Sequence, residues 1–420
     1  MIDRVRAWLA RWGPILPLLF AEFVLWLGIG ALLPVLPIYF EERGISPAML
    51  GIVIAAFPAA KLVSEPLFGW VADRVPRVPL LVIGLLVFGI IGALPLWLTD
   101  PLWFLVLRAG TGLGAAIYDP AARGFLTDAT PSDRQGEAFG LYGAAQMGGL
   151  LVGPAIGAIG AAWFGGIAFV FIFFAVTSVL AAVAIALRIR EGPRRGSSPT
   201  VRPEADGPVP ANLERRDRAV LRLANRGLIA AIVLNAGSSF GAGTYEVVWS
   251  LFLKGLGADL PLIGLTFAMF GLPVLLLSPV AGRLVDQRGP LPFLVLGSIL
   301  PAITGILYTF MTDPIVAVPL ILVEATGFAL LSPALYAVVA ANSPPSRTST
   351  AQGWYGAAGT FGFIVASLAT GFLMERSILY PFYAFAAGIT LSLVVALLIG
   401  RARMRNLGDP TSSAALATVP

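Results

Sequence analysis

Long apolar stretches separated by short polar loops run along most of this chain. Each stretch has about 20 residues or more, the length an α-helix needs to cross a bilayer. The stretches are continuous and lack the two-residue alternation of a transmembrane β-strand, so they predict helices, which satisfy their own backbone hydrogen bonds in lipid. They lie at 14–40, 48–70, 78–98, 101–124, 137–163, 166–187, 227–253, 260–284, 291–310, 314–341, 351–374 and 379–399. The pattern predicts an all-α membrane protein with twelve transmembrane helices.

Identical residues recur at one constant offset along the chain. The pairs lie 213 positions apart and are Gly69 and Gly282, Asp73 and Asp286, Pro120 and Pro333, Arg134 and Arg347, and Tyr142 and Tyr355. One register held across loops and helices indicates a tandem duplication in parallel orientation. We therefore expect two six-helix bundles related by a parallel repeat.

The loops predict the domain organisation and the orientation. We expect an amino-terminal bundle at 1–188, a linker at 189–225, a carboxy-terminal bundle at 226–400 and a tail at 401–420. The linker is rich in Pro, Gly, Ser and Arg, and its last part, 212–225, is either a helix on the membrane surface or a solvated tether. Arginines gather in alternate loops and at both ends of the chain, which predicts that both termini are cytoplasmic.

Composition supports a membrane protein and excludes several kinds of chemistry. The chain is 57% hydrophobic and 12% charged, far from the fractions typical of soluble domains. It has no cysteine and no histidine, so disulfides, thiolate chemistry and the usual zinc or haem ligands are excluded. We expect no metal and no cofactor. The net charge of +5 is dispersed over short loops, so we expect a lipid bilayer and no nucleic acid as partner, and a monomer.

A charged loop after the second apolar stretch resembles a family signature. Gly69-x-x-x-Asp73-Arg74-x-x-Arg77 resembles the loop between helices two and three of the major facilitator superfamily, although Pro76 replaces a family glycine. The resemblance implies the fold of that superfamily. It also implies a cytoplasmic network that latches the two halves, whose members would be Gly69, Asp73, Arg74, Arg77, Asp128, Arg134 and Asp286. Alternatively, these charges only set the orientation of the protein.

Two further stretches resemble one branch of the same superfamily. The run 105–116 is similar to the helix-four signature with its buried arginine, here Arg108. The run 148–157 is similar to the helix-five signature of drug/proton antiporters, through Gly149, Gly153, Pro154 and Gly157. This second resemblance implies proton-coupled export. Small residues also serve plain close packing between membrane helices, and that alternative stays open.

Few ionisable residues fall inside the apolar stretches, and each is a functional candidate because lipid does not tolerate an unpaired charge. They are Glu22, Lys61, Glu65, Arg108, Asp119, Glu246 and Glu324. Glu22 resembles the helix-one carboxylate of multidrug/proton exchangers and is our first candidate for a proton carrier, with Glu246 and Glu324 assisting. A desolvated carboxyl group can hold a proton and release it when a cation arrives. A hydrogen bond to a neighbouring helix is the structural alternative for all three.

The remaining candidates concern substrate contacts. Arg108 and Asp119 lie three turns apart on roughly one helix face and could line one cavity wall without touching. Lys61 and Glu65 have the spacing of a pair that neutralises itself within one helix. Aromatic rings can bind a flat organic cation through cation-π contacts. With the polar Gln146, they complete the predicted substrate site. The predicted contact residues are Trp26, Arg108, Asp119, Tyr142, Gln146, Trp249, Tyr336 and Tyr355.

These features together predict a function. We expect a proton-coupled transporter that exports small amphipathic, cationic compounds by alternating access around a midplane site. The rival within transporters is a carrier of a neutral, sugar-like or lipid-like solute. A membrane enzyme would depend on a buried carboxylate pair, and no such pair shares a helix face, so we expect no enzyme activity. No repeated filter-like segment favours a channel.

Overall fold

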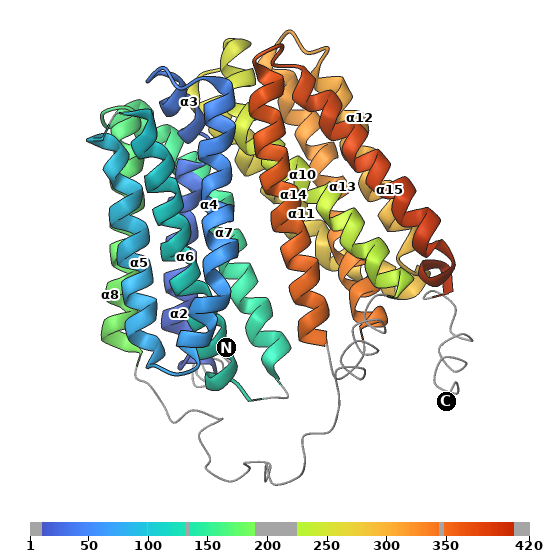
Figure 1. The fold of residues 1–420 in the computed structure, drawn as a ribbon, viewed down its shortest axis with the longest axis horizontal. Coiled ribbons are helices and arrows are strands. Elements are labelled where there is room, and N and C mark those ends of the chain that lie inside the picture. Colours follow the sequence, from blue (N-terminus) through green and yellow to red (C-terminus); the bar gives the residue numbers. More distant parts are fainter. Residues whose placement is uncertain (1–10, 99, 132–133, 190–224, 344–347, 407–420) are drawn as a thin grey trace, which may run out of the picture.

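The computed structural model describes residues 11–98, 100–131, 134–189, 225–343 and 348–406, and in this part of the chain the regular structure is all helical (Figure 1). The first half contains α2 (Leu16–Leu32), α3 (Leu36–Glu41), α4 (Pro47–Ala72), α5 (Arg77–Ala93), α6 (Pro101–Ala129), α7 (Gln135–Trp163) and α8 (Ile167–Arg188). The second half contains α10 (Arg226–Gly255), α11 (Leu260–Arg288), α12 (Leu291–Tyr308), α13 (Ala317–Asn342), α14 (Thr348–Met374) and α15 (Tyr380–Asn406). Two short 3-10 turns lie at Leu94–Leu96 and Pro314–Val316.

The helices confirm the predicted all-α membrane fold, with one correction. Within the described ranges, eleven helices are long and apolar enough to cross a membrane, and the shorter α2 belongs to the first predicted segment. That segment is not one helix, because it breaks between Leu32 and Leu36 into α2 and α3. Pro34 stands at the break, where a proline has no N–H to donate and its ring crowds the preceding turn.

Side-chain caps mark where several of the helices begin. Ser46, Asp100, Asn225 and Asp259 each stand just before a helix and accept a hydrogen bond from a backbone N–H of its first turn. Such caps satisfy donors that have no partner within the helix. Apart from Ile189 and Asn225, the predicted linker and its possible surface helix lie outside the described residues, as does the end of the predicted tail.

The helices form two bundles, one from α2 to α8 and one from α10 to α15, and the bundles repeat each other in space (Figure 1). In the first bundle, a Cβ built on Gly69 of α4 would lie 3.9 Å from the Cβ of Pro120 in α6. In the second, a Cβ on Gly282 of α11 would lie 4.0 Å from the Cβ of Pro333 in α13. The duplication that the sequence predicts is therefore present as the same helix contact in both bundles.

One face of the molecule carries the end of α8, Arg188, and the start of α10, Arg226, together with the first and last described residues; we name it the terminal face (Figure 1). The two bundles contact each other near the opposite face. There α4 packs on α14, and a Cβ on Gly51 would lie 3.0 Å from the Cα of Gly371. Likewise α11 packs on α7, and a Cβ on Gly264 would lie 2.7 Å from the carbonyl oxygen of Pro154.

An ion pair joins the bundles at this opposite face. Lys254, at the end of α10, donates to Glu41 Oε2 at 2.9 Å and to Glu42 Oε1 at 3.3 Å. All three side chains are more than a third exposed, so water and salt screen the attraction. Close helix packing therefore closes this face, and the ion pair adds a smaller contribution.

The residues predicted to form the latch lie at the terminal face. Arg77 pairs with Asp128 at 2.5 Å, both within the first bundle. Asp73 caps the end of α4, and Arg134 stands just before α7. Arg74 lies over the ring of Trp70, with 3.8 Å from its guanidinium carbon to the ring centroid. The exposed Asp286 of α11 makes no ion pair with another described side chain, and Arg347 lies outside the described residues.

Candidate functional site

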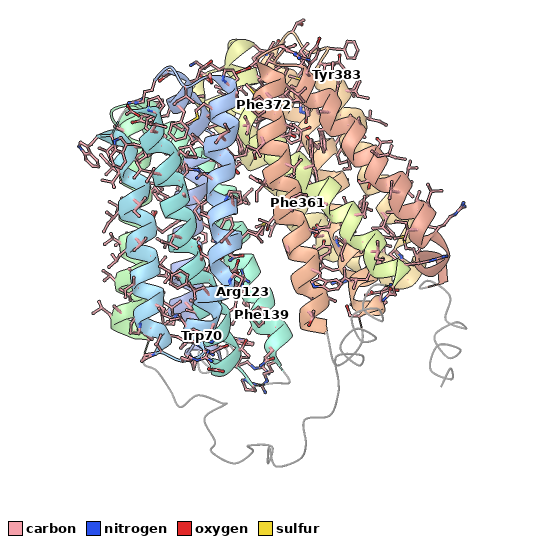
Figure 2. The ribbon with its side chains drawn as sticks, viewed as in Figure 1. Trp70, Arg123, Phe139, Phe361, Phe372 and Tyr383 are labelled. Carbon is pink, nitrogen blue, oxygen red and sulfur yellow. The ribbon has the colours of Figure 1, made fainter. Side chains whose placement is uncertain are left out.

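A cavity of about 2110 Å³ lies between the two bundles and extends toward the terminal face. Its walls come mainly from α2, α4, α6 and α7 of one bundle and from α10, α11, α13 and α14 of the other, with further residues from α3, α5 and α8. Most of its lining side chains are apolar. Figure 2 places Arg123 and Phe139, two of the lining residues, near the terminal face. The residues predicted for proton coupling or substrate contact that line this cavity are Trp26, Arg108, Asp119, Glu246, Trp249, Glu324, Tyr336 and Tyr355.

One ion pair crosses the cavity from bundle to bundle. Arg108 Nη2 of α6 donates to Glu246 Oε1 of α10 at 3.0 Å, and the two side chains are 15% and 18% exposed. The Arg108 guanidinium carbon also lies 5.1 Å from the ring centroid of Phe57. The partner of Arg108, which its own helix does not supply, is thus a carboxylate of the other half. Arg108 and Asp119 both line the cavity and pair with different partners.

Glu324 of α13 is a cavity carboxyl group that no described cation pairs with. The residue is 2% exposed, and Tyr308 donates its hydroxyl to Glu324 Oε2 at 2.7 Å. The other oxygen, Oε1, and the neighbouring Tyr245 hydroxyl are buried without a hydrogen bond of good geometry in the described part of the chain. A buried polar atom without a partner is costly, which makes Oε1 a ready acceptor for a ligand or a proton.

Glu22 occupies a different environment from Glu324. It is fully buried and is not among the residues that line the cavity. Tyr118 donates to its Oε1 at 2.7 Å and Gln146 to its Oε2 at 3.0 Å. Tyr142 is also buried, and neither it nor Gln146 lines the cavity. Tyr118, itself a lining residue, therefore connects this carboxyl group to the wall of the cavity.

Four charged side chains surround the part of the cavity nearer the terminal face; we name Lys61, Glu65, Asp119 and Arg123 the charge quartet. Lys61 pairs with Asp119. Arg123 pairs with Glu65 at 3.1 Å and with Asp119 at 3.5 Å. The prediction that Lys61 and Glu65 neutralise each other within α4 is wrong. Both side chains instead find partners on α6, because that helix packs along the same face of α4.

The predicted aromatic residues divide between the cavity surface and the packed interior. Tyr336 and Tyr355 lie with ring centroids 5.5 Å apart, and Tyr336 is 52% exposed. Trp26 is half-buried in the first bundle. Trp249 is 2% exposed and donates its Nε1–H to Thr266 Oγ1 at 2.9 Å. Tyr336 therefore offers an accessible ring, and Trp249 mainly fixes the packing around α10.

The small residues of the helix-five signature lie in helix contacts. A Cβ on Gly153 would lie 2.9 Å from the Cα of Gly30, and one on Gly157 would lie 2.7 Å from the Cα of Ala31. Gly149 faces the same helix, so these glycines let α7 approach the backbone of α2. The carbonyl of Pro154 meets α11 of the other bundle, as described above. This geometry supports the packing interpretation, and the link to antiport stays a prediction.

Sequence reasoning missed several residues that complete the site. Tyr118, Tyr245 and Tyr308 contribute phenol groups around the buried carboxyl groups, and Tyr118 and Tyr245 are sequence neighbours of the candidates Asp119 and Glu246. Arg123 lies four residues after Asp119, which is a usable signal for an ion pair on one helix face.

The chain is similar to known proteins along almost all of its length. The model of the Major Facilitator Superfamily matches residues 18–245 and 231–418. Multidrug resistance protein 2 of Bacillus subtilis (strain 168) is 26% identical over 384 residues, which cover 89% of this chain and 92% of that protein. Quinolone resistance protein NorA of Staphylococcus aureus (strain COL) is 23% identical over 401 residues, covering 93% and 97%. A bacterial homolog of the human lysosomal transporter Spinster, solved in an inward-facing and unoccupied conformation, aligns with a TM-score of 0.75 at 16% identity, covering 93% and 97%.

Proposed function

This chain belongs to the Major Facilitator Superfamily, and we propose that within it the chain exports small amphipathic, cationic compounds in exchange for protons. It is a multi-pass membrane transporter rather than an enzyme. The exchange would use the cavity between the bundles as the substrate site. Alternating access would open that cavity first to one side of the membrane and then to the other.

The observation that carries this proposal is that the Glu324 carboxyl group lines the mostly apolar cavity without a cationic partner among the described residues. Its Oε1 lies beside the Tyr245 hydroxyl without a hydrogen bond of good geometry. An isolated intramembrane carboxyl group marks an ion or substrate pathway, because lipid-embedded protein tolerates it only with a partner or a proton. A lipophilic cation and a proton can each satisfy it, and they exclude each other.

The ion pair between Arg108 and Glu246 would couple binding to motion. A cationic substrate in the cavity would compete with Arg108 for Glu246, and the loss of this pair would remove one attraction between the bundles. Glu22 remains a second candidate proton carrier, reached through Tyr118. We rank Glu324 first because it lines the cavity and Glu22 does not.

Relatives and orientation support export from the cell. The relatives named for multidrug and quinolone resistance span almost the whole chain at 26% and 23% identity. The distribution of arginines supports a cytoplasmic position of the terminal face. In this arrangement the cavity extends toward the cytoplasm and is closed at the outer face, which is the state in which an exporter takes up its substrate. The Spinster homolog supports only the fold at its level of identity.

Substrate-driven proton movement in proteoliposomes tests the proposal. A pH-sensitive dye inside the vesicles would report protons that move when a lipophilic cation is added outside. We expect flux with wild type and a loss of at least about tenfold with Glu324→Gln, since the amide cannot exchange a proton. Glu22→Gln and Glu246→Gln, measured in parallel, would rank the other carboxyl groups.

The matched control is Glu375→Gln, which removes a carboxylate just beyond the end of α14 and outside the cavity lining. It should leave the flux unchanged. If no cation moves protons while a neutral solute still exchanges, the proposal is wrong, and the sugar-like or lipid-like alternative replaces it.

A further inference from the structure

The charge quartet has no charged counterpart in the second bundle. At the offset of 213 residues, the positions equivalent to Lys61, Glu65, Asp119 and Arg123 are Val274, Ser278, Ser332 and Tyr336. The prolines that follow two of these positions do repeat, as Pro66 with Pro279 and Pro120 with Pro333. The register is therefore secure where the charges differ. The duplication has kept the backbone of this region and has made the side chains of the two walls chemically different.

The two walls face the same space at similar depth. Repeat-related positions in a parallel two-half transporter are related by an axis along the membrane normal, so they lie at one level on opposite sides. All four quartet residues line the cavity, and so do Tyr336 and its neighbour Tyr355. One wall thus offers two cations and two anions, and the wall across from it offers a tyrosine ring that is about half exposed.

The quartet is electrically balanced, which restricts what can bind there. Its two positive and two negative side chains already pair with each other. A ligand with a single charge would take one member and leave that member's partner uncompensated in a partly buried site, which costs free energy. A ligand that carries both charges can insert between the members of a pair and leave every charge compensated.

Arg123 is the member that can open most easily. Its side chain is 51% exposed, and its contacts of 3.1 and 3.5 Å are long for charge-assisted hydrogen bonds. Its guanidinium can also bind a carboxylate through two parallel N–H bonds, which a single contact to Glu65 does not use. A ligand carboxylate could therefore replace Glu65 on Arg123, and the freed Glu65 could accept a ligand ammonium group.

We infer that the charge quartet and Tyr336 form a substrate subsite near the terminal face, and that this subsite selects aromatic zwitterions over aromatic cations. The ring of the ligand would lie against Tyr336, and its two charges would lie against Arg123 and Glu65. The inference rests on the proposed function, because it treats the cavity as a substrate site. It differs from the role of Glu324, since that carboxyl group would select a cation deeper in the same cavity.

A pair of dyes that differ by one methyl ester, and therefore in net charge, tests the subsite. The probes are a rhodamine with a free benzoate, which is a zwitterion, and its methyl ester, which is a cation. Their dissociation constants would be measured by fluorescence polarisation on the purified full-length protein in nanodiscs. We expect Arg123→Gln to weaken binding of the zwitterion about tenfold, through the loss of charge-assisted hydrogen bonds. The ester should bind this variant as well as or better than wild type, because Glu65 loses its cation.

Two control variants separate recognition from structure. Arg288→Gln removes an exposed positive charge from the terminal face and outside the cavity lining, and it should change neither constant. Arg123→Lys keeps the charge and should restore most of the preference for the zwitterion. Unchanged binding of the ester to Arg123→Gln also shows that this variant is folded. If Arg123→Gln weakens both dyes equally, or leaves the ratio of the constants unchanged, the inference is wrong.

The outcome is independent of proton coupling. A wild-type protein that discriminates between the dyes but moves no protons would contradict the proposed antiport and leave the subsite standing. A protein that exchanges protons normally, with a ratio of dye affinities that Arg123→Gln does not change, would contradict only the subsite.

Discussion

The closure of the face opposite the terminal face, which is the outer face in the proposed orientation, depends on a contact that is too tight for any side chain. Gly51 of α4 meets α14 of the other bundle, where a Cβ would lie 3.0 Å from the Cα of Gly371 and would also press on the carbonyl oxygen of Ser367. Both obstacles are backbone atoms, which cannot rotate away as a side chain can. Gly51→Ala should therefore push the two helices apart at this face.

The size of the effect follows from the cost of overpacking. An extra carbon in a well-packed contact costs ~1–3 kcal/mol. In an alternating-access cycle this contact exists only while the outer face is closed, so the cost applies to that state and spares the state open to the outside. An energy of ~1–3 kcal/mol changes the ratio of the two states by about 5- to 150-fold.

Cysteine labelling can measure this shift directly, because the chain has no cysteine of its own. Ala357, an exposed residue of α14 that lines the cavity, would be replaced by cysteine as a reporter. A membrane-impermeant maleimide applied from the cytoplasmic side of inverted vesicles reacts only while the cavity is open to that side. Gly51→Ala should slow this reaction and speed labelling from the opposite side.

The matched control is Gly143→Ala on α7, where an added Cβ would meet nothing within 4 Å. It should leave both labelling rates unchanged. The reasoning would be refuted if Gly51→Ala labelled from the cytoplasmic side as fast as wild type while remaining folded. In that case the contact between α4 and α14 would not hold the outer face closed.

Three further predictions follow from the ion pairs and the glycine contacts. Arg108→Leu should lower the stability of the purified protein by ~1–3 kcal/mol, because it leaves the Glu246 carboxylate unpaired. The double variant with Glu246→Leu should recover part of this loss, and a double-mutant cycle on melting data checks it. Lys254→Gln should shift labelling in the same direction as Gly51→Ala but by only ~0.2–1 kcal/mol, and high salt should remove the difference. Gly153→Ala should lower the melting temperature through overpacking of α7 on α2, with no change in the ratio of the two labelling rates.

The hydropathy pattern predicted the helices because the length of a membrane span is a property of the local sequence. Apolar runs of sufficient length must form helices in lipid whatever they pack against. The pattern failed at the break between α2 and α3, although Pro34 was visible in the sequence. A proline inside an apolar run can be absorbed within a helix, as Pro58 and Pro120 are, or it can end one, and neighbouring helices decide which occurs.

The partners of the charged residues were harder to predict than the residues themselves. Lys61 and Glu65 have the spacing of a local pair, yet Lys61 binds Asp119, which lies 58 residues further along the chain. Arg108 binds Glu246, 138 residues away. Such contacts depend on which face of each helix is turned toward a neighbour. In helices that are apolar on every side, the sequence gives little indication of that rotation.

The rotation of α2 also explains why Glu22, our first candidate for the proton carrier, does not line the cavity. Trp26, one turn further along the helix, does line the cavity, and Glu22 does not. Four residues along a helix lie close to one face but not at the same angle or depth. The hydrogen bonds from Tyr118 and Gln146 hold the carboxyl group on the inner side of the bundle, and no spacing rule could have revealed them.

The contact between Gly69 and Pro120 has an identical copy between Gly282 and Pro333, whereas none of the charges of the quartet is copied. A duplicated gene begins with two equal halves, so parts that remain alike have served both halves equally, and parts that differ have served only one. The shared contacts let the two bundles move as equivalent mechanical units, and in the proposed subsite the unshared side chains decide what is carried. Substrate range could therefore change through substitutions on one bundle alone, without disturbing the machinery that both bundles use to open and close.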